Sequence, residues 1–416
     1  MKSFARINRI ALVWMALVVA TKSVAAVTAL AWDSLPALPP SAGEMKQPGV
    51  AGPFAGVHGD ALIVAGGANF PDKLPWDGGA KIWWSDVWVL ENLSSAAPRW
   101  VTDRSFELPR RIGYGISVST PDGVICAGGH DAERCYADVF MLSWDARVRQ
   151  IRRTDLPPLP EPLSFMAGAL VGTTLYIAGG QTTMTNPVAS SIFWSLDLSK
   201  SDRAAEFKWS VLPPWPGPAR ILAVAAAQST VRGEEFFLFS GRRPQAGQAT
   251  QILSDAYAFD PRTRRWRTLP SVGDGLRSGL SVMAGSAAAV GASEILLFGG
   301  DRGELFQDLE AHDLMIAHLR ARIASRSESE RVALERQIAE QVAAKRRIYD
   351  SHPGFARDVL AYDTARDLWR SVGRSPVLPP VTTVMVKYGD AVLIPSGEVK
   401  PGIRSPAIIK VMPAVR

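Results

Sequence analysis

The chain has 416 residues, of which 47% are hydrophobic and 21% charged, with a formal net charge of +6. These proportions are typical of a folded soluble protein and exclude wholesale disorder, and no aromatic-basic motif accompanies the modest positive charge, so nucleic acid is not an expected partner. Thirty prolines, 35 glycines and 13 tryptophans favour a repeat β-fold with short strands, many turns and a recurring Trp.

Residues 1–26 have the three parts of a secretory signal peptide. Three basic residues between Lys2 and Arg9 precede an apolar run at 10–20, and small residues follow up to Ala26. This pattern predicts cleavage near Ala26, and the apolar run is too short to span a membrane comfortably. We expect a periplasmic or secreted protein with no membrane contact after cleavage. The alternative is an uncleaved N-terminal anchor.

The only cysteines are Cys126 and Cys135, which flank one loop of the sequence. Across neighbouring strands they could form a disulfide, which would contribute roughly 2.5 to 3 kcal/mol in the chain-entropy model. Two ordinary buried thiols are the other interpretation, and the sequence leaves both open.

One pattern recurs from residue 61 onward: an apolar strand that closes on glycine, a loop, a strand resembling D-V-x-x-L/Y-D, and a strand with Trp that runs into Leu-Pro. The closing glycines are Gly67, Gly129, Gly180, Gly241, Gly300 and Gly397. A spacing of about fifty to sixty residues is the Kelch period. The sequence therefore predicts an all-β fold, a six-bladed Kelch-type β-propeller over residues 27–416.

The sixth repeat lacks its last strand, whereas the N-terminus has a spare one. Residues 32–40 read WDSLPALPP, a segment of the Trp and Leu-Pro kind with no repeat before it. We expect this segment to close the final blade, because a closed ring leaves no open strand edge.

A helical insertion interrupts the fifth repeat at residues 308–350. Its apolar residues are spaced for amphipathic helices, and the polar stretch 326–330 predicts a break between two of them. The insertion follows a glycine-ended strand, so it should rise over one face of the ring. A lid, a contact between two copies of the chain in a homodimer, or a solvated charged hairpin are the alternatives.

Propeller geometry brings the residue after each closing glycine to one mouth of the central channel. These residues are Ala68, His130, Gln181, Arg242, Asp301 and Glu398. The starts of the inner strands add Arg110, Arg111, Arg220 and Arg277. Guanidinium groups bind carboxylates through paired hydrogen bonds, so this mouth favours an acidic small molecule. The competing interpretation is that half of these arginines are solvated loop residues.

Other chemistries lack the residues they need. Two of the five histidines lie in the helical insertion and a third, His58, lies at an expected hairpin turn, so they should not converge on a metal. The sequence has no Cys-x-x-Cys, phosphate-binding Gly-rich loop or serine nucleophile elbow. We therefore expect no metal and no cofactor.

Two segments resemble the bacterial N-acetylneuraminate epimerases, which are sialic acid mutarotases. Residues 49–56 read GVAGPFAG and run on to AGGANF at 65–70, and residues 397–404 read GEVKPGIR. In that family the second segment precedes the first. The chain thus resembles a cyclically permuted member, which a closed ring tolerates because it can be opened at any blade.

The resemblance implies a cofactor-free mutarotase that interconverts α- and β-N-acetylneuraminate. Glu398 would be the proton acceptor and Arg404 its electrostatic or substrate-binding partner. The residues implied or expected to bind substrate are Arg220, Arg111, Asn69, Lys400, Arg242 and Gln181. One departure concerns the family's R-A-Y-G turn, which reads RIGYG at 111–115 and is one residue longer. The alternatives are a mutarotase of another acidic sugar and a non-catalytic Kelch propeller that binds a protein or a glycan.

Overall fold

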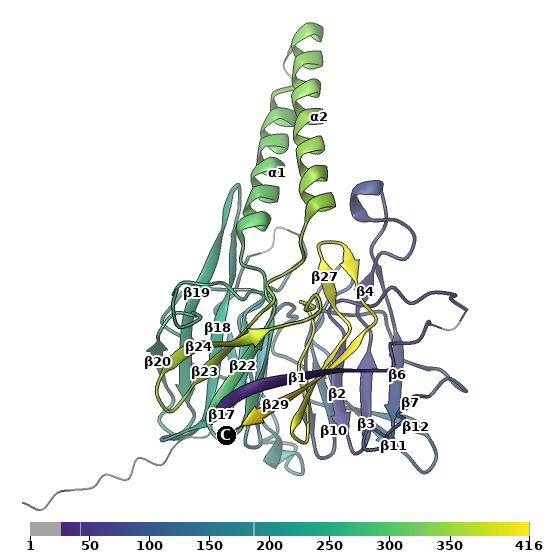
Figure 1. Ribbon diagram of the computed structural model, residues 1–416, viewed down its shortest axis with the longest axis vertical. Helices are drawn as coiled ribbons and strands as arrows, with labels where there is room; N and C mark the ends of the chain where they lie inside the picture. The colour runs from purple at the N-terminus through teal and green to yellow at the C-terminus, as the bar shows by residue number, and fades with distance from the viewer. Residues whose placement is uncertain (1–25, 42, 186–187, 324–325, 416) are drawn as a thin grey trace, which may run out of the picture.

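The computed structural model describes residues 26–41, 43–185, 188–323 and 326–415. Its strands form six antiparallel sheets around a central channel, together with two short ribbons (Figure 1). The predicted six-bladed β-propeller is therefore confirmed. No helix in these ranges is long and apolar enough to cross a membrane. The predicted signal peptide lies, except for its last residue, outside the described residues.

The first three blades run from the innermost to the outermost strand in chain order. The first contains β2 (Phe54–His58), β3 (Ala61–Ala65), β6 (Asp86–Glu91), β7 (Arg99–Trp100) and β8 (Phe106–Glu107). The second contains β9 (Ile116–Thr120), β10 (Gly123–Ala127), β11 (Val139–Asp145) and β12 (Gln150–Asp155). The third contains β13 (Ala167–Val171), β14 (Thr174–Ala178), β15 (Phe193–Asp197) and β16 (Ser210–Val211), with a short helical turn η2 (Leu198–Lys200) after β15.

The last three blades include the longest hairpin and the closure of the ring. The fourth contains β17 (Val224–Thr230), β18 (Gly233–Gln245), β19 (Gln248–Asp260) and β20 (Arg265–Leu269). The fifth contains β21 (Ser286–Val290), β22 (Glu294–Phe298), β23 (Asp358–Asp363) and β24 (Leu368–Arg374). The sixth contains β25 (Val386–Tyr388), β26 (Ala391–Pro395), β29 (Ile408–Val415) and, at its outer edge, the N-terminal strand β1 (Val27–Leu35).

Strand β1 runs antiparallel to β29, with Leu35 opposite Ile408. It ends before Pro36, not at residue 40 as expected from the sequence, because a proline lacks the N–H that a strand ladder needs.

The remaining elements rise from one face of the ring, the upper face in Figure 1. They are helices α1 (Glu304–Ile323) and α2 (Glu328–Ser351), the ribbon of β4 (Ala68–Asn69) with β5 (Ile82–Trp83), the ribbon of β27 (Glu398–Lys400) with β28 (Ile403–Arg404), and the helical turn η1 (Pro75–Asp77). Helix α1 thus begins four residues before the predicted insertion (304 against 308). Ser327 and Glu330 form a capping box that starts α2.

The recurring Trp and the recurring Leu-Pro are two ends of one contact between neighbouring blades. The indole N–H of Trp266 donates to the carbonyl of Pro213 at 2.9 Å. The same contact joins Trp100 to Pro36, Trp209 to Pro157, and Trp369 to Pro270, each at 2.9 Å. Each of these prolines follows a leucine. The repeat in the sequence therefore marks the joint between blades.

A closed collar of backbone hydrogen bonds surrounds the channel just before the inner strands begin. In each blade one N–H donates to the carbonyl of the preceding blade's residue, at 2.6 to 3.0 Å, and the circle closes through Gly52, Tyr114, Phe165, Leu222, Ala284 and Thr382. All six residues have φ between 50° and 67°. Five of them are not glycine, so the ring holds them in a conformation that L-residues adopt at a cost.

The two cysteines are buried thiols and form no disulfide. Cys126 lies within β10, and burial raises its pKa. The Cys135 sulfur lies 3.2 Å from the Ser164 hydroxyl oxygen. Of the two interpretations that the sequence left open, the structure has the pair of buried thiols.

Candidate functional site

The residues that follow the closing glycines occupy equivalent places around the mouth. Each forms a backbone bridge with the residue just before the collar, and the pairs are Ala51–Ala68, Gly113–His130, Ser164–Gln181, Ile221–Arg242, Met283–Asp301 and Val381–Glu398. The collar is the floor of this mouth. The floor carries aromatic side chains at Tyr114 and Phe165, whereas Gly52 has no side chain and Ala284 has only a methyl group.

Glu398 and Arg404 face each other across the β27–β28 ribbon. The backbone N–H of Gly402 donates to Glu398 Oε1 at 2.7 Å, and Arg404 Nη1 lies 3.4 Å from the same oxygen. Only 18% of the Glu398 side chain and 4% of the Arg404 side chain are exposed. The Arg404 guanidinium lies 4.8 Å above the ring of Phe70. The GEVKPGIR segment therefore folds into a hairpin that presents a nearly buried carboxylate beside an arginine.

Arg242 of the fourth blade adds a second cation, and Asp301 of the fifth blade adds a second carboxylate. Burial lowers the pKa of Arg242, and the charges of Asp301, Glu310 and Glu398 partly oppose that effect. Its guanidinium lies 4.3 Å above the ring of Phe306. Burial raises the pKa of Asp301, against the hydrogen bond from Gly303 and the charge of Arg242. Asp301 is thus easier to protonate than an exposed aspartate.

An aromatic cluster forms the opposite side of the mouth. The ring of His130 stacks on Tyr114 at 4.8 Å and meets the edges of Phe165 at 4.7 Å and Trp83 at 5.6 Å. The Lys81 ammonium lies 4.1 Å above the Tyr114 ring and 4.8 Å above the Trp83 ring. Burial, and then the charge of Lys81, lower the pKa of His130 to about 3. His130 is therefore neutral at physiological pH.

Buried polar atoms without a hydrogen-bond partner gather in this mouth. Within the described ranges there are eleven, and eight of them belong to the mouth: Trp76 Nε1, Trp83 Nε1, Tyr114 OH, both ring nitrogens of His130, Arg242 Nε, and Nε and Nη1 of Arg404. Buried polar groups in folded proteins are nearly always paired. Such a concentration of unpaired donors indicates a place where a polar molecule binds.

Helices α1 and α2 stand over the mouth and contact it on two sides. On one side the Glu310 carboxylate accepts from the backbone N–H of Thr250 at 2.7 Å. On the other side Tyr349 stacks on Trp76 at 4.2 Å, and Arg346 pairs with Asp77. Trp76 in turn packs on Gly402, where an added Cβ would lie 3.0 Å from the indole ring. The helical pair thus abuts the hairpin that carries Glu398.

The arginine cluster predicted from the starts of the inner strands does not form. Arg220 is wholly buried, and its guanidinium donates to both carboxylate oxygens of Asp255 and to the carbonyl of Ser240. Arg277 pairs with Asp274 at 2.7 Å, and Arg110 lies 3.6 Å from Asp138. The Arg220 guanidinium is therefore occupied by Asp255 within the fold, and the substrate-binding role expected for Arg220 stays a prediction.

Two further residues expected to bind substrate are Arg111 and Asn69. Arg111 is exposed, and its charge acts on Asp86 at the start of β6, away from Glu398. Asn69 is buried and is used by the fold: its amide donates to Gly49 O at 2.8 Å and accepts from the Trp84 indole at 2.9 Å. The Asn69 amide is thus engaged within the fold, and the substrate-binding roles expected for Arg111 and Asn69 stay predictions.

Gln181 and Lys400 lie at the mouth with different availability. The Gln181 amide donates to Thr183 O at 2.9 Å, within its own loop. Lys400 is half-buried in β27, and its charge lowers the pKa of His352 at the end of α2, after the larger effect of burial. Sequence reasoning missed Trp76, Lys81 and Trp83, because nothing in the local pattern distinguishes them from ordinary loop residues.

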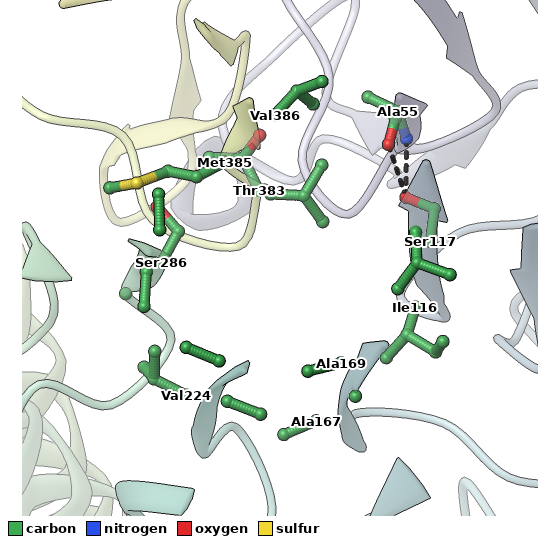
Figure 2. A pocket seen from close by; sticks show the side chains of 18 of the residues that line it. Ala55, Ile116, Ser117, Ala167, Ala169, Val224, Ser286, Thr383, Met385 and Val386 are labelled. Carbon is green, nitrogen blue, oxygen red and sulfur yellow. Dashed lines mark hydrogen bonds between the residues drawn. The ribbon is translucent and has the colours of Figure 1, made fainter. Parts of the chain in front are cut away.

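The channel has a volume of about 340 Å³, and its lining includes the six collar residues, Tyr114 and Phe165 among them. Small side chains surround it, among them Ala55, Ala167 and Ala169, with the hydroxyls of Ser117 and Thr383 (Figure 2). None of the residues that line it is a carboxylate, so Glu398 and Asp301 lie outside the lining of this channel. Within the part of the chain that the structure describes, no group of three or more potential metal ligands occurs.

The fold and the mouth define a class of protein: a six-bladed β-propeller that presents a carboxylate, arginines and unpaired donors at one end of its channel. The chain belongs to the N-acetylneuraminate epimerase family, whose model matches residues 18–151 and 156–413.

Individual relatives agree with this membership. The chain is 28% identical over 255 residues to the N-acetylneuraminate epimerase of Yersinia enterocolitica, in an alignment covering 61% of this chain and 56% of that protein. It is 35% identical over 130 residues to the one of Brucella melitensis, covering 29% and 32%. The chain thus matches little more than half the length of such relatives. The solved structure of YjhT has the same fold, with a TM-score of 0.57 and 12% identity over 92% of this chain and 99% of that one.

Proposed function

We propose that this protein is a cofactor-free mutarotase that interconverts α- and β-N-acetylneuraminate. The observation that carries the proposal is the Glu398–Arg404 pair, nearly buried in the mouth and surrounded by unpaired donors. Membership of the N-acetylneuraminate epimerase family supports the choice of sugar. The repeats are of the Kelch kind, and the order of the two family-like segments makes the chain a cyclic permutant.

Mutarotation requires a base, an acid and an anchor for the substrate. Opening the cyclic hemiketal moves the anomeric hydroxyl proton to a base while an acid protonates the ring oxygen, and the ring closes again on the other face of the new carbonyl. Glu398 takes the hydroxyl proton. Asp301, whose pKa burial raises, supplies the proton to the ring oxygen. Reclosure returns both protons, so no net consumption occurs.

The two mouth arginines hold the sugar carboxylate. Arg404 Nε and Arg242 Nε are buried donors without partners, Arg404 Nη1 lies 3.4 Å from Glu398 Oε1, and each guanidinium lies over an aromatic ring. Rigid guanidinium groups bind carboxylates with little loss of side-chain freedom. The carboxylate therefore lies between blades four and six, within reach of both acids of the mouth.

Proton NMR of freshly released α-N-acetylneuraminate tests the proposal. The protein should speed the approach to anomeric equilibrium far beyond the spontaneous rate, and Glu398→Gln should lower that acceleration by about 100-fold or more, because an amide cannot accept the proton. Asp301→Glu, which keeps a carboxyl group, is the matched control and should retain part of the rate. No acceleration by the wild-type protein would contradict the proposal; acceleration with another acidic sugar would move it to that substrate.

The setting and assembly of the enzyme are part of the same proposal. Residues 1–26 direct export, which leaves the mature protein in the periplasm or outside the cell. The helical pair joins two copies, supported by Met315, Val332 and Val342, whose side chains are about half exposed on α1 and α2. Light scattering of the purified protein, with Val332→Lys for comparison, tests the dimer. A monomeric wild-type protein would contradict it.

A further inference from the structure

The aromatic side of the mouth contains unpaired polar atoms that the proposed acid-base chemistry does not use. Trp83 Nε1, Tyr114 OH and both ring nitrogens of His130 are buried without hydrogen-bond partners. His130 is 1% exposed and Tyr114 is 6% exposed. Neutral imidazole provides one donor and one acceptor, indole one donor, and phenol both. The cluster therefore offers several unmet hydrogen bonds within a shell of ring faces.

These groups suit an amide better than an anion. The faces of Trp83, Tyr114 and Phe165 carry partial negative charge, so they repel a carboxylate and attract C–H groups and cations. The position of the Lys81 ammonium above two of these rings is consistent with that preference. An acetamido group matches the cluster in every part: its carbonyl accepts, its N–H donates, and its methyl packs on a ring.

The cluster belongs to the same mouth as the proposed catalytic pair. In the β4–β5 ribbon, Trp83 pairs with Ala68. Two residues after Ala68, Phe70 lies beneath the Arg404 guanidinium. The β4–β5 ribbon and the residue that follows β4 thus carry one contact to each half of the site.

We infer that the pocket formed by Trp83, Tyr114, His130 and Phe165 is the subsite for the acetamido substituent of the sugar. This inference rests on the proposed function for the identity of the substrate. The carboxylate is held by the arginines, and the acetamido group is bound by the aromatic cluster. The cluster therefore determines specificity, whereas Glu398 and Asp301 determine rate.

Two isosteric variants test the subsite. Trp83→Phe and Tyr114→Phe each remove one unpaired polar group and keep the ring. Each should lower kcat/KM for N-acetylneuraminate by about 3- to 10-fold, mainly through KM, since one neutral hydrogen bond has that effect. For the analogue with a hydroxyl in place of the acetamido group, the loss should stay below about two-fold. Tyr388→Phe is the matched control. It removes a hydroxyl of β25 that donates to Asp60 in the turn between β2 and β3.

The outcomes separate this inference from the proposed function. Equal losses for both sugars, or no loss for either, would overturn the subsite. A loss confined to an analogue with a shortened glycerol chain would assign the cluster to that chain instead and would also overturn it. If the wild-type protein accelerates neither sugar, calorimetric binding of the two sugars decides. A wild-type preference for the acetamido sugar that both variants abolish supports the subsite even then, and equal binding contradicts it.

Discussion

The bodies of the blades and the mouth of the channel differ in how their buried polar groups are paired. In the blades, Arg220 is paired with Asp255, and the indole of Trp266 donates to Pro213. In the mouth, the same functional groups recur in Arg404 and Trp83, and the Arg404 Nε–H and the Trp83 indole N–H have no hydrogen-bond partner within the described ranges. Eight of the eleven buried polar atoms without a partner among the described residues belong to the mouth, whereas Ser286 and Ser293 of the fifth blade contribute one each. The mouth therefore differs from the blades in how many unpaired polar atoms it gathers, and residue type and burial alone do not distinguish the two.

The largest expected effect concerns the buried ion pair of Arg220 and Asp255. Arg220→Met should lower the free energy of unfolding by about 3–5 kcal/mol, because it leaves Asp255 without its cation in a largely buried position. Chemical denaturation measures this change. Arg277→Met is the matched control: the Arg277 side chain is 68% exposed, and Asp274 keeps the backbone N–H groups of Leu276 and Arg277 as donors, so the loss should be below about 1 kcal/mol. Similar losses for the two variants would contradict the distinction.

A smaller effect concerns the joint between blades. Trp266→Phe keeps an aromatic ring and removes the N–H that bonds Pro213, which should cost about 1 kcal/mol of stability. The mutarotation rate should be unchanged, since the joint lies at the outer strands. Trp83→Phe removes an N–H that has no partner and should leave the unfolding free energy within about 0.5 kcal/mol of wild type. If Trp83→Phe proved the more destabilising of the two, the paired and unpaired classes would be misassigned.

The smallest expected effect concerns the backbone strain in the collar. Ala284 has φ of 58°, so Ala284→Gly relieves backbone strain and should change stability between zero and about +1 kcal/mol. Ala288→Gly, in the inner strand β21, has no such strain to relieve and should destabilise by about 0.5–1 kcal/mol. Thermal denaturation of the two variants gives the comparison. Destabilisation by Ala284→Gly as large as that by Ala288→Gly would show that the collar is not strained.

The sequence predicts the blades well because each repeat carries its own evidence. The closing glycines, the Trp and the Leu-Pro all correspond to contacts that recur with the repeat, such as that between Trp100 and Pro36. The hairpin of Glu398 and Arg404 could also be anticipated, since both residues lie in one eight-residue segment.

The rest of the site depends on partners that come from distant parts of the chain. Asp255, thirty-five residues after Arg220, occupies its donors, and no pattern around Arg220 indicates this pairing. The aromatic cluster was missed because Trp83, His130 and Phe165 meet only after three blades have packed together. Local pattern cannot show which polar groups remain unpaired, and that property defines this mouth.

The most direct test of the central claim is to measure rate and stability together in Arg404→Met. We expect kcat/KM for anomer exchange to fall by about 30-fold or more, because the substrate carboxylate loses a buried charged partner. We also expect a smaller loss of unfolding free energy than Arg220→Met causes, because among the described residues the only charged partner of the guanidinium is the Glu398 carboxylate at 3.4 Å and no hydrogen bond is broken. A variant that keeps its rate, or that loses several kcal/mol of stability as Arg220→Met should, would contradict the account.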